Sequence, residues 1–321
     1  MCTRFIYQTN TNQFITARSM DWNDPKAKSR VMVYPRGLKQ TGGSMDNALT
    51  WTSKYGSIFT SFYDVASSDG INECGLVANT LYLAEADYGD AALTNKPRLS
   101  IGAWNQYFLD NFATVAEAVS AMQNPEFIIT APTLPNGRAA SVHLAISDPT
   151  GDSAILEYID GELVIHHGGE FQVMTNSPTY DQQIAINDYW ELIGGNRMLP
   201  GTINAADRFV RTNYLLKSTP KFEDGNMATS ACTSIIRAVS VPLGMADPDH
   251  PNISATLWRT ISDHTAKRYM FDSPFKSAVF WLDIDKVNLE ADAPIMALNL
   301  DSQLSGESSA ELTPHKAINW L

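Results

Sequence analysis

The chain has 321 residues, of which 44% are hydrophobic and 10% aromatic, and its formal net charge is −12 at pH 7. This length and composition fit a globular protein with a large core and exclude a disordered chain. The acidic excess argues against binding to nucleic acid, which requires a basic surface. The longest apolar run, 277–282, is far too short to span a membrane, so no membrane partner is expected.

The chain opens directly with Met1 and Cys2, without a charged segment followed by an apolar one. A secretory leader would show both segments, so the sequence as given predicts a cytoplasmic protein. If a native leader has been removed, the prediction changes to a periplasmic one.

The first third of the chain is predicted to be mostly strands, and two helices follow. Two β-like runs, 2–7 and 13–18, flank the turn-rich segment 9–12 and predict an N-terminal hairpin. Further strands are predicted at 31–34, 56–62 and 76–83, with a turn at Asp69-Gly70 between the last two. The helices are expected at 101–109 and from Thr114 onward, where Thr114 and Glu117 have the spacing of a capping box.

The remaining chain continues in the same blocks. A meander is predicted from the strands 141–147, 154–158, 162–165 and 171–174, helices from 184–193 and 206–217, and final strands from 268–271 and 278–282. Blocks of strands and helices favour antiparallel sheets with segregated helices, hence the α+β class. Because no linker-like or repeated segment interrupts the chain, we expect a single domain over 1–321.

The cysteines and histidines are not spaced for metal binding. Cys2, Cys74 and Cys232 fit neither a zinc site nor a disulfide framework. No HExxH motif or i,i+4 histidine pair is present, nor a Walker loop, a GxGxxG fingerprint or a GxSxG elbow. We therefore expect no metal and no organic cofactor, and interpret Cys74 and Cys232 as buried or half-buried thiols without chemistry.

Cys2 differs from the other cysteines because removal of Met1 would make it N-terminal. The residue would then carry a thiol and a free α-amine, whose ordinary pKa of about 7.7–8.0 suits proton transfer near neutral pH. The amine could act as the general base for its own side chain, directly or through a water. Taken alone, Cys2 could equally be an incidental residue beside the start of the chain.

Five motifs in one order resolve this choice. They are Cys2-Thr3-Arg4, 17–22, 69–73, 175–178, and Leu199-Pro200-Gly201 through 207–211. This set resembles the choloylglycine hydrolase and penicillin V acylase family of N-terminal nucleophile hydrolases, over at least 2–281. The resemblance implies a four-layer αββα sandwich with two stacked antiparallel sheets.

The resemblance also implies roles for five residues. Cys2 matches the nucleophile, Arg18 the arginine beside the thiol, and Asp21 the aspartate that bonds the new α-amine. Asn176 matches the oxyanion-holding asparagine, and Arg208 the second active-site arginine. The chemistry agrees: a nearby arginine favours a thiolate, and one amide donor to an oxyanion can contribute about 3–4 kcal/mol.

Alternatives exist for some of these residues. Arg211 lies three positions after Arg208 and could be confused with it. Arg18 and Asp21 could be a surface ion pair worth about 0–1 kcal/mol. Asn176 could be a simple turn residue before Pro178. Their occurrence together with Cys2 favours the catalytic interpretation.

Two departures from the family pattern bear on substrate and assembly. By the resemblance, bile-salt-cleaving members carry a Leu-Asn-Phe pattern whose asparagine is a second oxyanion donor. The matching run here is 81–83, with Tyr82 in place of the asparagine, so the Tyr82 backbone N–H could be the donor instead. The stretch between Asn176 and Arg208 is shorter than in the Gram-positive relatives, and the chain resembles the Gram-negative branch more closely. The resemblance implies a homo-oligomer, a tetramer in the family, but this shortening puts the contacts in question.

The resemblance predicts a cysteine amidohydrolase that cleaves a linear C–N amide of a small molecule. Penicillin V and N-acyl homoserine lactones are the leading substrates, conjugated bile salts are the alternative, and a non-catalytic binding protein is the remote one. Trp22 and Tyr82 are predicted to line an apolar substrate pocket. Tyr88 and the aromatic residues of 59–63 could also line it, but a place in the core is favoured for them.

Overall fold

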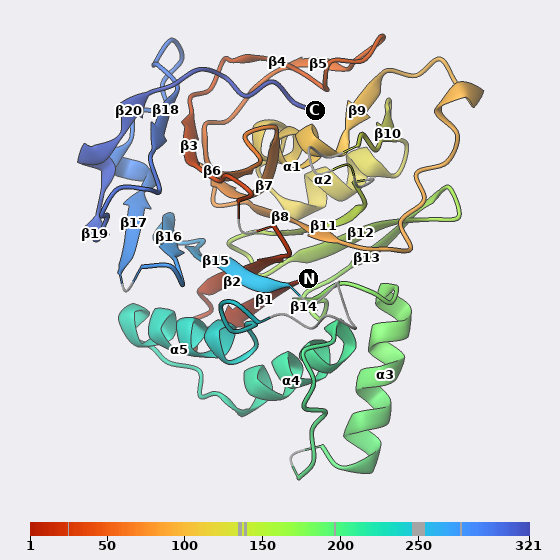
Figure 1. Ribbon diagram of the computed structural model, residues 1–321, viewed down its shortest axis with the longest axis vertical. Coiled ribbons are helices and arrows are strands. Elements are labelled where there is room, and N and C mark those ends of the chain that lie inside the picture. The colour runs from red at the N-terminus through yellow and green to blue at the C-terminus, as the bar shows by residue number, and fades with distance from the viewer. Residues whose placement is uncertain (25, 134–136, 138–139, 196, 246–253, 277) are drawn as a thin grey trace.

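Two stacked sheets form the centre of the protein (Figure 1). The computed structural model describes residues 1–24, 26–133, 137, 140–195, 197–245, 254–276 and 278–321. Within these residues the first sheet has seven strands in the order β14-β1-β2-β15-β16-β17-β19. Their bounds are β1 Cys2–Gln8, β2 Phe14–Trp22, β14 Val173–Met174, β15 Ala255–Asp263, β16 Arg268–Asp272, β17 Val279–Asp283 and β19 Gly306–Glu307.

The second sheet has nine described strands in the order β13-β12-β11-β8-β7-β6-β3-β18-β20. Their bounds are β3 Val31–Tyr34, β6 Ser57–Phe62, β7 Ala66–Asn72, β8 Val77–Tyr82, β11 Val142–Ser147, β12 Ser153–Ile159, β13 Glu162–His167, β18 Met296–Leu298 and β20 Thr313–Pro314. Two short pairs lie outside the sheets: β4 Lys39–Thr41 with β5 Thr50–Thr52, and β9 Arg98–Ser100 with β10 Ile128–Thr130.

Helices cover the outer face of each sheet, which gives four layers (Figure 1). α1 Ile101–Asn111 and α2 Val115–Met122 pack on the second sheet, whereas α4 Ala205–Ser218 and α5 Gly225–Ala238 pack on the first. α3 Tyr180–Ile193 lies beside α4. The predicted αββα sandwich with antiparallel sheets is confirmed. None of the helices in the described ranges combines the length and apolar composition of a membrane span.

The N-terminal hairpin lies in the middle of the first sheet. β1 pairs with β2 in a register that places Cys2 opposite Met20 and Arg4 opposite Arg18. Asn12 takes a positive φ of 57° in the turn, a conformation that asparagine tolerates well. Because the second sheet covers one face and α4 and α5 cover the other, β1 and β2 are buried almost throughout.

The predicted turn at Asp69-Gly70 is wrong, because both residues lie inside β7. A side chain at Gly70 would meet Leu109, Phe59 and the Ile58 carbonyl, all within 2.8 Å of its Cβ position. The glycine therefore permits close packing in the strand rather than a turn. The chain reverses later, at Gly75, where φ is +86°.

Two further predictions need correction, and one strand was missed. The predicted four-strand meander ends after three strands, because β14 lies in the first sheet and pairs with β1. The missed strand is β15, which lies in the interior of the first sheet. In the capping box, Thr114 accepts from the Glu117 N–H at 3.2 Å as expected, but the Glu117 carboxylate reaches the N–H of Ala113 rather than that of Thr114.

Candidate active site

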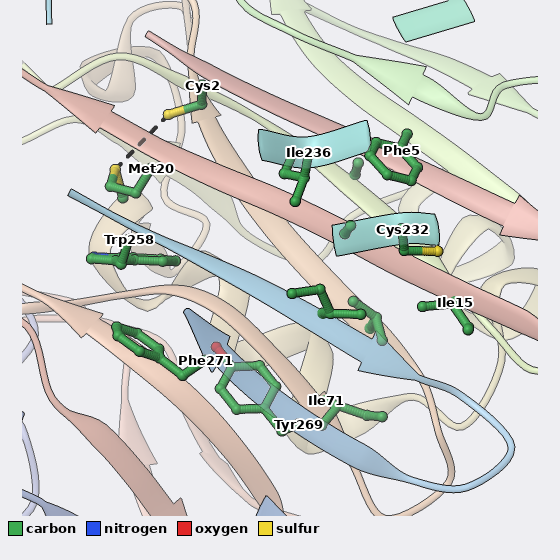
Figure 2. Packing of buried hydrophobic residues seen from close by; sticks show 14 of the residues in the cluster. Cys2, Phe5, Ile15, Met20, Ile71, Cys232, Ile236, Trp258, Tyr269 and Phe271 are labelled. Carbon is green, nitrogen blue, oxygen red and sulfur yellow. Dashed lines mark hydrogen bonds between the residues drawn. The ribbon is translucent and has the colours of Figure 1, made fainter. Parts of the chain in front are cut away.

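Cys2 begins β1 and is 2% exposed. Its Sγ lies 3.9 Å from the Met20 Sδ across the β1–β2 pair (Figure 2). The same Sγ lies 3.9 Å from the Arg18 Nη2. The edge of a pocket reaches the thiol, since Cys2, Arg18 and Met20 all line it. The hairpin thus places a thiol beside a cation at the boundary between core and pocket.

Arg18 is fully buried and is held by Thr80 and Trp258. Its Nη2 donates to the Thr80 carbonyl at 3.1 Å, and its guanidinium lies 4.3 Å from the ring centroid of Trp258. Its Nε and Nη1 have no hydrogen-bond partner among the described residues. A permanent positive charge with unsatisfied donors therefore lies beside the Cys2 thiol.

Asp21 lies near the N-terminal end of the chain, and only one of its carboxylate oxygens accepts a hydrogen bond from the described residues. The Thr256 hydroxyl donates to its Oδ1 at 2.6 Å, while its buried Oδ2 has no hydrogen-bond partner in the part of the chain that is described. The Met1 amine donates to the Asp21 carbonyl at 2.6 Å. Burial lowers the pKa of this α-amine, although Cys2 and Asp21 act in the opposite direction. An amine held here is therefore biased toward its neutral, basic form.

Asn176 and Arg208 surround the backbone of Cys2. The Asn176 Oδ1 accepts from the Cys2 N–H and, at 3.0 Å, from the Arg208 Nη2, while its Nδ2 donates to the Tyr82 carbonyl at 2.6 Å. The Arg208 Nη1 donates to the Cys2 carbonyl at 2.5 Å and lies 3.8 Å from the Asp21 Oδ2. Burial lowers the pKa of Arg208, and Asp21 opposes this change. The five residues predicted from the sequence thus form one cluster.

Arg211 does not join this cluster. It is half-buried, and its Nη1 donates to the carbonyls of Pro200 and Thr202 at 2.9 and 2.6 Å. Arg208 thus contacts the backbone of Cys2 on β1, whereas Arg211 bonds to the loop before α4.

An aromatic wall stands beside Cys2. The Trp22 ring centroid lies 5.6 Å from that of Phe62 and 6.4 Å from that of Tyr82, and all three residues line the pocket. The Trp22 Nε1 donates to the Tyr63 hydroxyl at 2.9 Å, which donates in turn to Asp24 at 2.8 Å. These bonds hold the indole in place. Phe62, for which a place in the core was favoured, lines the pocket as well.

Tyr88 is partly buried and packs against the core, which is the place that the sequence favoured for it. Its hydroxyl accepts from the Val142 N–H and donates to the Val142 carbonyl, both at 2.8 Å, and its ring packs against Tyr158. Tyr88 therefore contacts residues of β11 and β12, and it does not line the pocket.

Several residues of the site escaped sequence reasoning. Thr256 and Trp258 both lie on β15, the strand that was not predicted. Asp69 lies in a buried network in which the Tyr269 hydroxyl donates at 2.5 Å and the Asn79 amide at 2.6 Å. Arg4 extends this network through Asn79 at 3.4 Å. Asp69 and Arg4 belong to two of the five motifs, 69–73 and Cys2-Thr3-Arg4, but these motifs did not identify the partners of either residue.

The other two cysteines lie in unreactive surroundings. Burial raises the pKa of Cys232 well above its ordinary value, and this thiol lies on α5, away from that of Cys2 (Figure 2). Burial also raises the pKa of Cys74, which is half-buried. Across the described ranges, no cluster of His, Cys, Asp and Glu side chains could hold a metal ion.

The fold and this cluster define a class of protein. Residues 2–297 match the family of linear amide C–N hydrolases known as the choloylglycine hydrolase family. The chain belongs to this family and is a linear amide C–N hydrolase.

Particular relatives narrow the comparison. The chain is 45% identical to a penicillin V acylase of Pectobacterium atrosepticum, over 99% of this chain and 92% of that protein. The structure of penicillin V acylase from Agrobacterium tumefaciens superposes with a TM-score of 0.92 at 47% identity, covering 100% of this chain and 99% of that one.

Conjugated bile acid hydrolases are more distant. That of Lactobacillus gasseri is 21% identical over 90% of this chain and 98% of its own length. A variant of the Clostridium perfringens enzyme superposes with a TM-score of 0.79 at 21% identity, over 95% of this chain and 98% of that one. At this identity the likeness shows the fold alone.

Proposed function

We propose that Cys2, made N-terminal by removal of Met1, is the nucleophile of the amide hydrolysis. The α-amine of Cys2 takes the thiol proton. The Asp21 Oδ2, which accepts no hydrogen bond from the described residues, stabilises the resulting ammonium. Arg18 stabilises the thiolate from 3.9 Å. The sulfur then attacks the carbonyl carbon of the substrate, and the C=O electron pair moves to oxygen.

In this proposal the oxyanion is held by the Asn176 side-chain amide and by the Tyr82 backbone N–H. Such donors act on charge that exists only in the transition state. The C–N bond breaks as the ammonium returns a proton to the leaving nitrogen, which departs as an amine. Water then attacks the Cys2 thioester, the acid leaves, and the thiol is restored. Arg208 holds Asn176 and the Cys2 backbone next to each other, because it donates hydrogen bonds to both.

We further propose penicillin V, an N-acyl homoserine lactone or both as substrates. The observation that carries this proposal is the fixed wall of Trp22, Phe62 and Tyr82 beside Cys2. A wall of this kind suits a flat phenoxyacetyl group or a fatty acyl chain, because both bury apolar area against aromatic rings. The 45% identity to a penicillin V acylase supports the first substrate. A conjugated bile salt remains the second candidate, on the more distant relatives.

A hydrolysis panel tests the substrate. It should contain penicillin V, penicillin G, glycocholate, taurocholate and acyl-homoserine lactones of several lengths. We expect kcat/KM for penicillin V or a lactone to exceed that for glycocholate by about tenfold or more, a difference of about 1.4 kcal/mol in transition-state binding. Equal or faster turnover of glycocholate would assign the protein to the bile salt hydrolases instead.

Intact-mass analysis tests the processing step. Active enzyme should lack Met1, and an uncleavable N-terminal extension should abolish turnover. Full activity with Met1 retained would overturn the role of the Cys2 amine. The tetramer implied by the resemblance stays a prediction, which sedimentation of the purified protein can check.

A further inference from the structure

The last residues of the sequence lie against the pocket that holds Cys2. Leu321 lines this pocket together with Cys2, Trp22 and Phe62, although 319 positions separate Leu321 from Cys2 along the chain. Figure 1 shows this end of the chain beside α1, on the side of the second sheet. A segment from the end of the sequence thus forms part of the wall of the candidate active site.

The segment 318–321 is anchored before it reaches the pocket. The Ile318 N–H donates to the Tyr34 hydroxyl at 2.7 Å. Trp320 is 2% exposed, its ring centroid lies 6.3 Å from that of Tyr34 and 6.1 Å from that of Phe59, and its Nε1 donates to Gln40 at 3.3 Å. This packing fixes the backbone that leads to Leu321.

The backbone of Leu321 is held on both sides. Its N–H donates to the Val65 carbonyl at 3.0 Å, and its carbonyl accepts from the Ser100 hydroxyl. Val65 lies between β6 and β7, whereas Ser100 is the N-cap of α1. With both backbone groups bonded to different elements, the Leu321 side chain has a defined position in the pocket wall.

In the proposed reaction, an acyl group bound at Cys2 extends toward the part of the pocket wall that contains Leu321. In the proposed reaction the carbonyl carbon must reach the Cys2 sulfur on β1, so the rest of the acyl group extends toward walls formed by other elements. Val65, Ile101 and Gly102 line the pocket around the site where Leu321 is bonded. Leu321 adds a branched apolar side chain to this wall, which a long acyl chain must pass or displace.

We propose that Leu321 determines which acyl groups the pocket accepts, by limiting the length that fits beside the α1 end of the wall. This inference rests on the proposed function, in which the acyl group occupies this pocket. Among the described residues, the hydrogen bonds of Leu321 go to Val65 and Ser100 and not to a predicted catalytic group, so its proposed role is to select the substrate rather than to perform chemistry. In hydrophobic pockets, one methylene changes discrimination by about tenfold or more.

Two substitutions test the proposal in opposite directions. Leu321→Ala opens the wall, and Leu321→Trp narrows it, while both keep the backbone bonds. The readout is the ratio of kcat/KM for N-dodecanoyl over N-hexanoyl homoserine lactone. We expect Leu321→Ala to raise this ratio about fivefold or more and Leu321→Trp to lower it by a similar factor. Leu93→Ala is the matched control, because Leu93 is 84% exposed, and it should leave the ratio unchanged.

A binding measurement separates this inference from the proposed function. In the Cys2→Ala background, calorimetry gives the affinities of hexanoate and dodecanoate without turnover. If the wild type hydrolyses neither lactone, the proposed substrate fails, but the affinity ratio should still shift with Leu321→Ala. Ratios within twofold of the Leu321 parent in both variants would overturn the proposal. Loss of all activity and binding at an unchanged thermal midpoint would also overturn it, because a selecting wall does not abolish both.

Discussion

Two buried layers of this protein differ in the partners of their buried titratable side chains. In a first layer, on the two faces of the first sheet, charged side chains are buried near opposite charges: Arg208, on the α4 side, lies 3.8 Å from Asp21. Burial raises the pKa of Asp69, and the charge of Arg18 opposes this change. Between the second sheet and α1, the core is built from side chains such as Trp104 and Phe108.

The second layer contains a buried carboxyl of its own, which shows the contrast. Asp110 is bonded by two neutral donors, the Trp51 Nε1 at 2.7 Å and the Gln106 amide at 2.8 Å. Burial raises the pKa of Asp110 to about 7, and these donors reduce the shift only in part. Asp110 therefore has neutral donors as its partners, whereas the buried carboxyls of the layer that contains the site lie near arginines. The comparison predicts that changes to the catalytic cluster of the first layer affect activity, whereas changes in the second layer affect stability.

The largest expected effect is that of Cys2→Ala. Removal of the proposed nucleophile should lower kcat by about 10⁴-fold or more. The thermal midpoint should stay near that of the wild type, because the substitution removes only one sulfur at the edge of a pocket. Steady-state kinetics and a melting curve measure both quantities. Cys232→Ala is the control and should keep most of the activity. Substantial turnover by Cys2→Ala would show that the chemistry lies elsewhere.

Phe108→Ala should give the reverse pattern. Phe108 is fully buried and packs against Trp104 and Phe112, at centroid distances of 6.4 and 5.3 Å. The cavity should lower the free energy of unfolding by about 3–5 kcal/mol, as measured by denaturant titration. At temperatures where the variant is folded, kcat should change less than twofold. A large loss of kcat in the folded variant would contradict the separation of the two layers.

Asp110→Asn should remove a pH dependence from the second layer. The folded-state pKa of about 7 exceeds the ordinary value, so the native protein binds more protons than the unfolded chain between pH 4 and 7. Wild-type stability from this group is therefore lost as the pH rises through that range, by up to about 4 kcal/mol. Unfolding titrations at several pH values should show the variant gaining relative to the wild type from pH 4 to 7. A pH-independent difference would contradict the assignment.

His264→Asn should remove a smaller dependence of opposite sign. His264 lies in the first layer, where its Nδ1 donates to the Gly75 carbonyl at 2.7 Å and its Nε2 lies 2.8 Å from the Thr16 hydroxyl. Burial lowers the pKa of His264 to about 4, although the bond to Gly75 opposes this. The unfolded chain then binds more protons below pH 6.5, so stability is lost as the pH falls from 6.5 to 4, by up to about 3 kcal/mol. Acid unfolding of both proteins checks this, and identical acid limbs would contradict it.

Local patterns predicted much of this fold. The turn residues of 9–12 and the alternation around them located the N-terminal hairpin, and Thr114 marked the start of α2. Both depend on interactions within a few residues, which the sequence contains directly. Asp69-Gly70 was misinterpreted because the same residue pair can form a turn or allow close packing. Only Leu109 and Phe59, on neighbouring elements, decide which.

By itself the sequence determined the class of protein, because the order of the motifs around Cys2, Arg18, Asn176 and Arg208 reflects a shared fold. It also determined that Cys2 carries two reactive groups once Met1 is removed. Only the tertiary structure decided which polar atoms meet. Thr256 reaches Asp21 across 235 positions, and Leu321 enters the wall of the pocket near Cys2. Contacts of such long separation arise from how the sheets and the segments around them pack, and no local pattern encodes them.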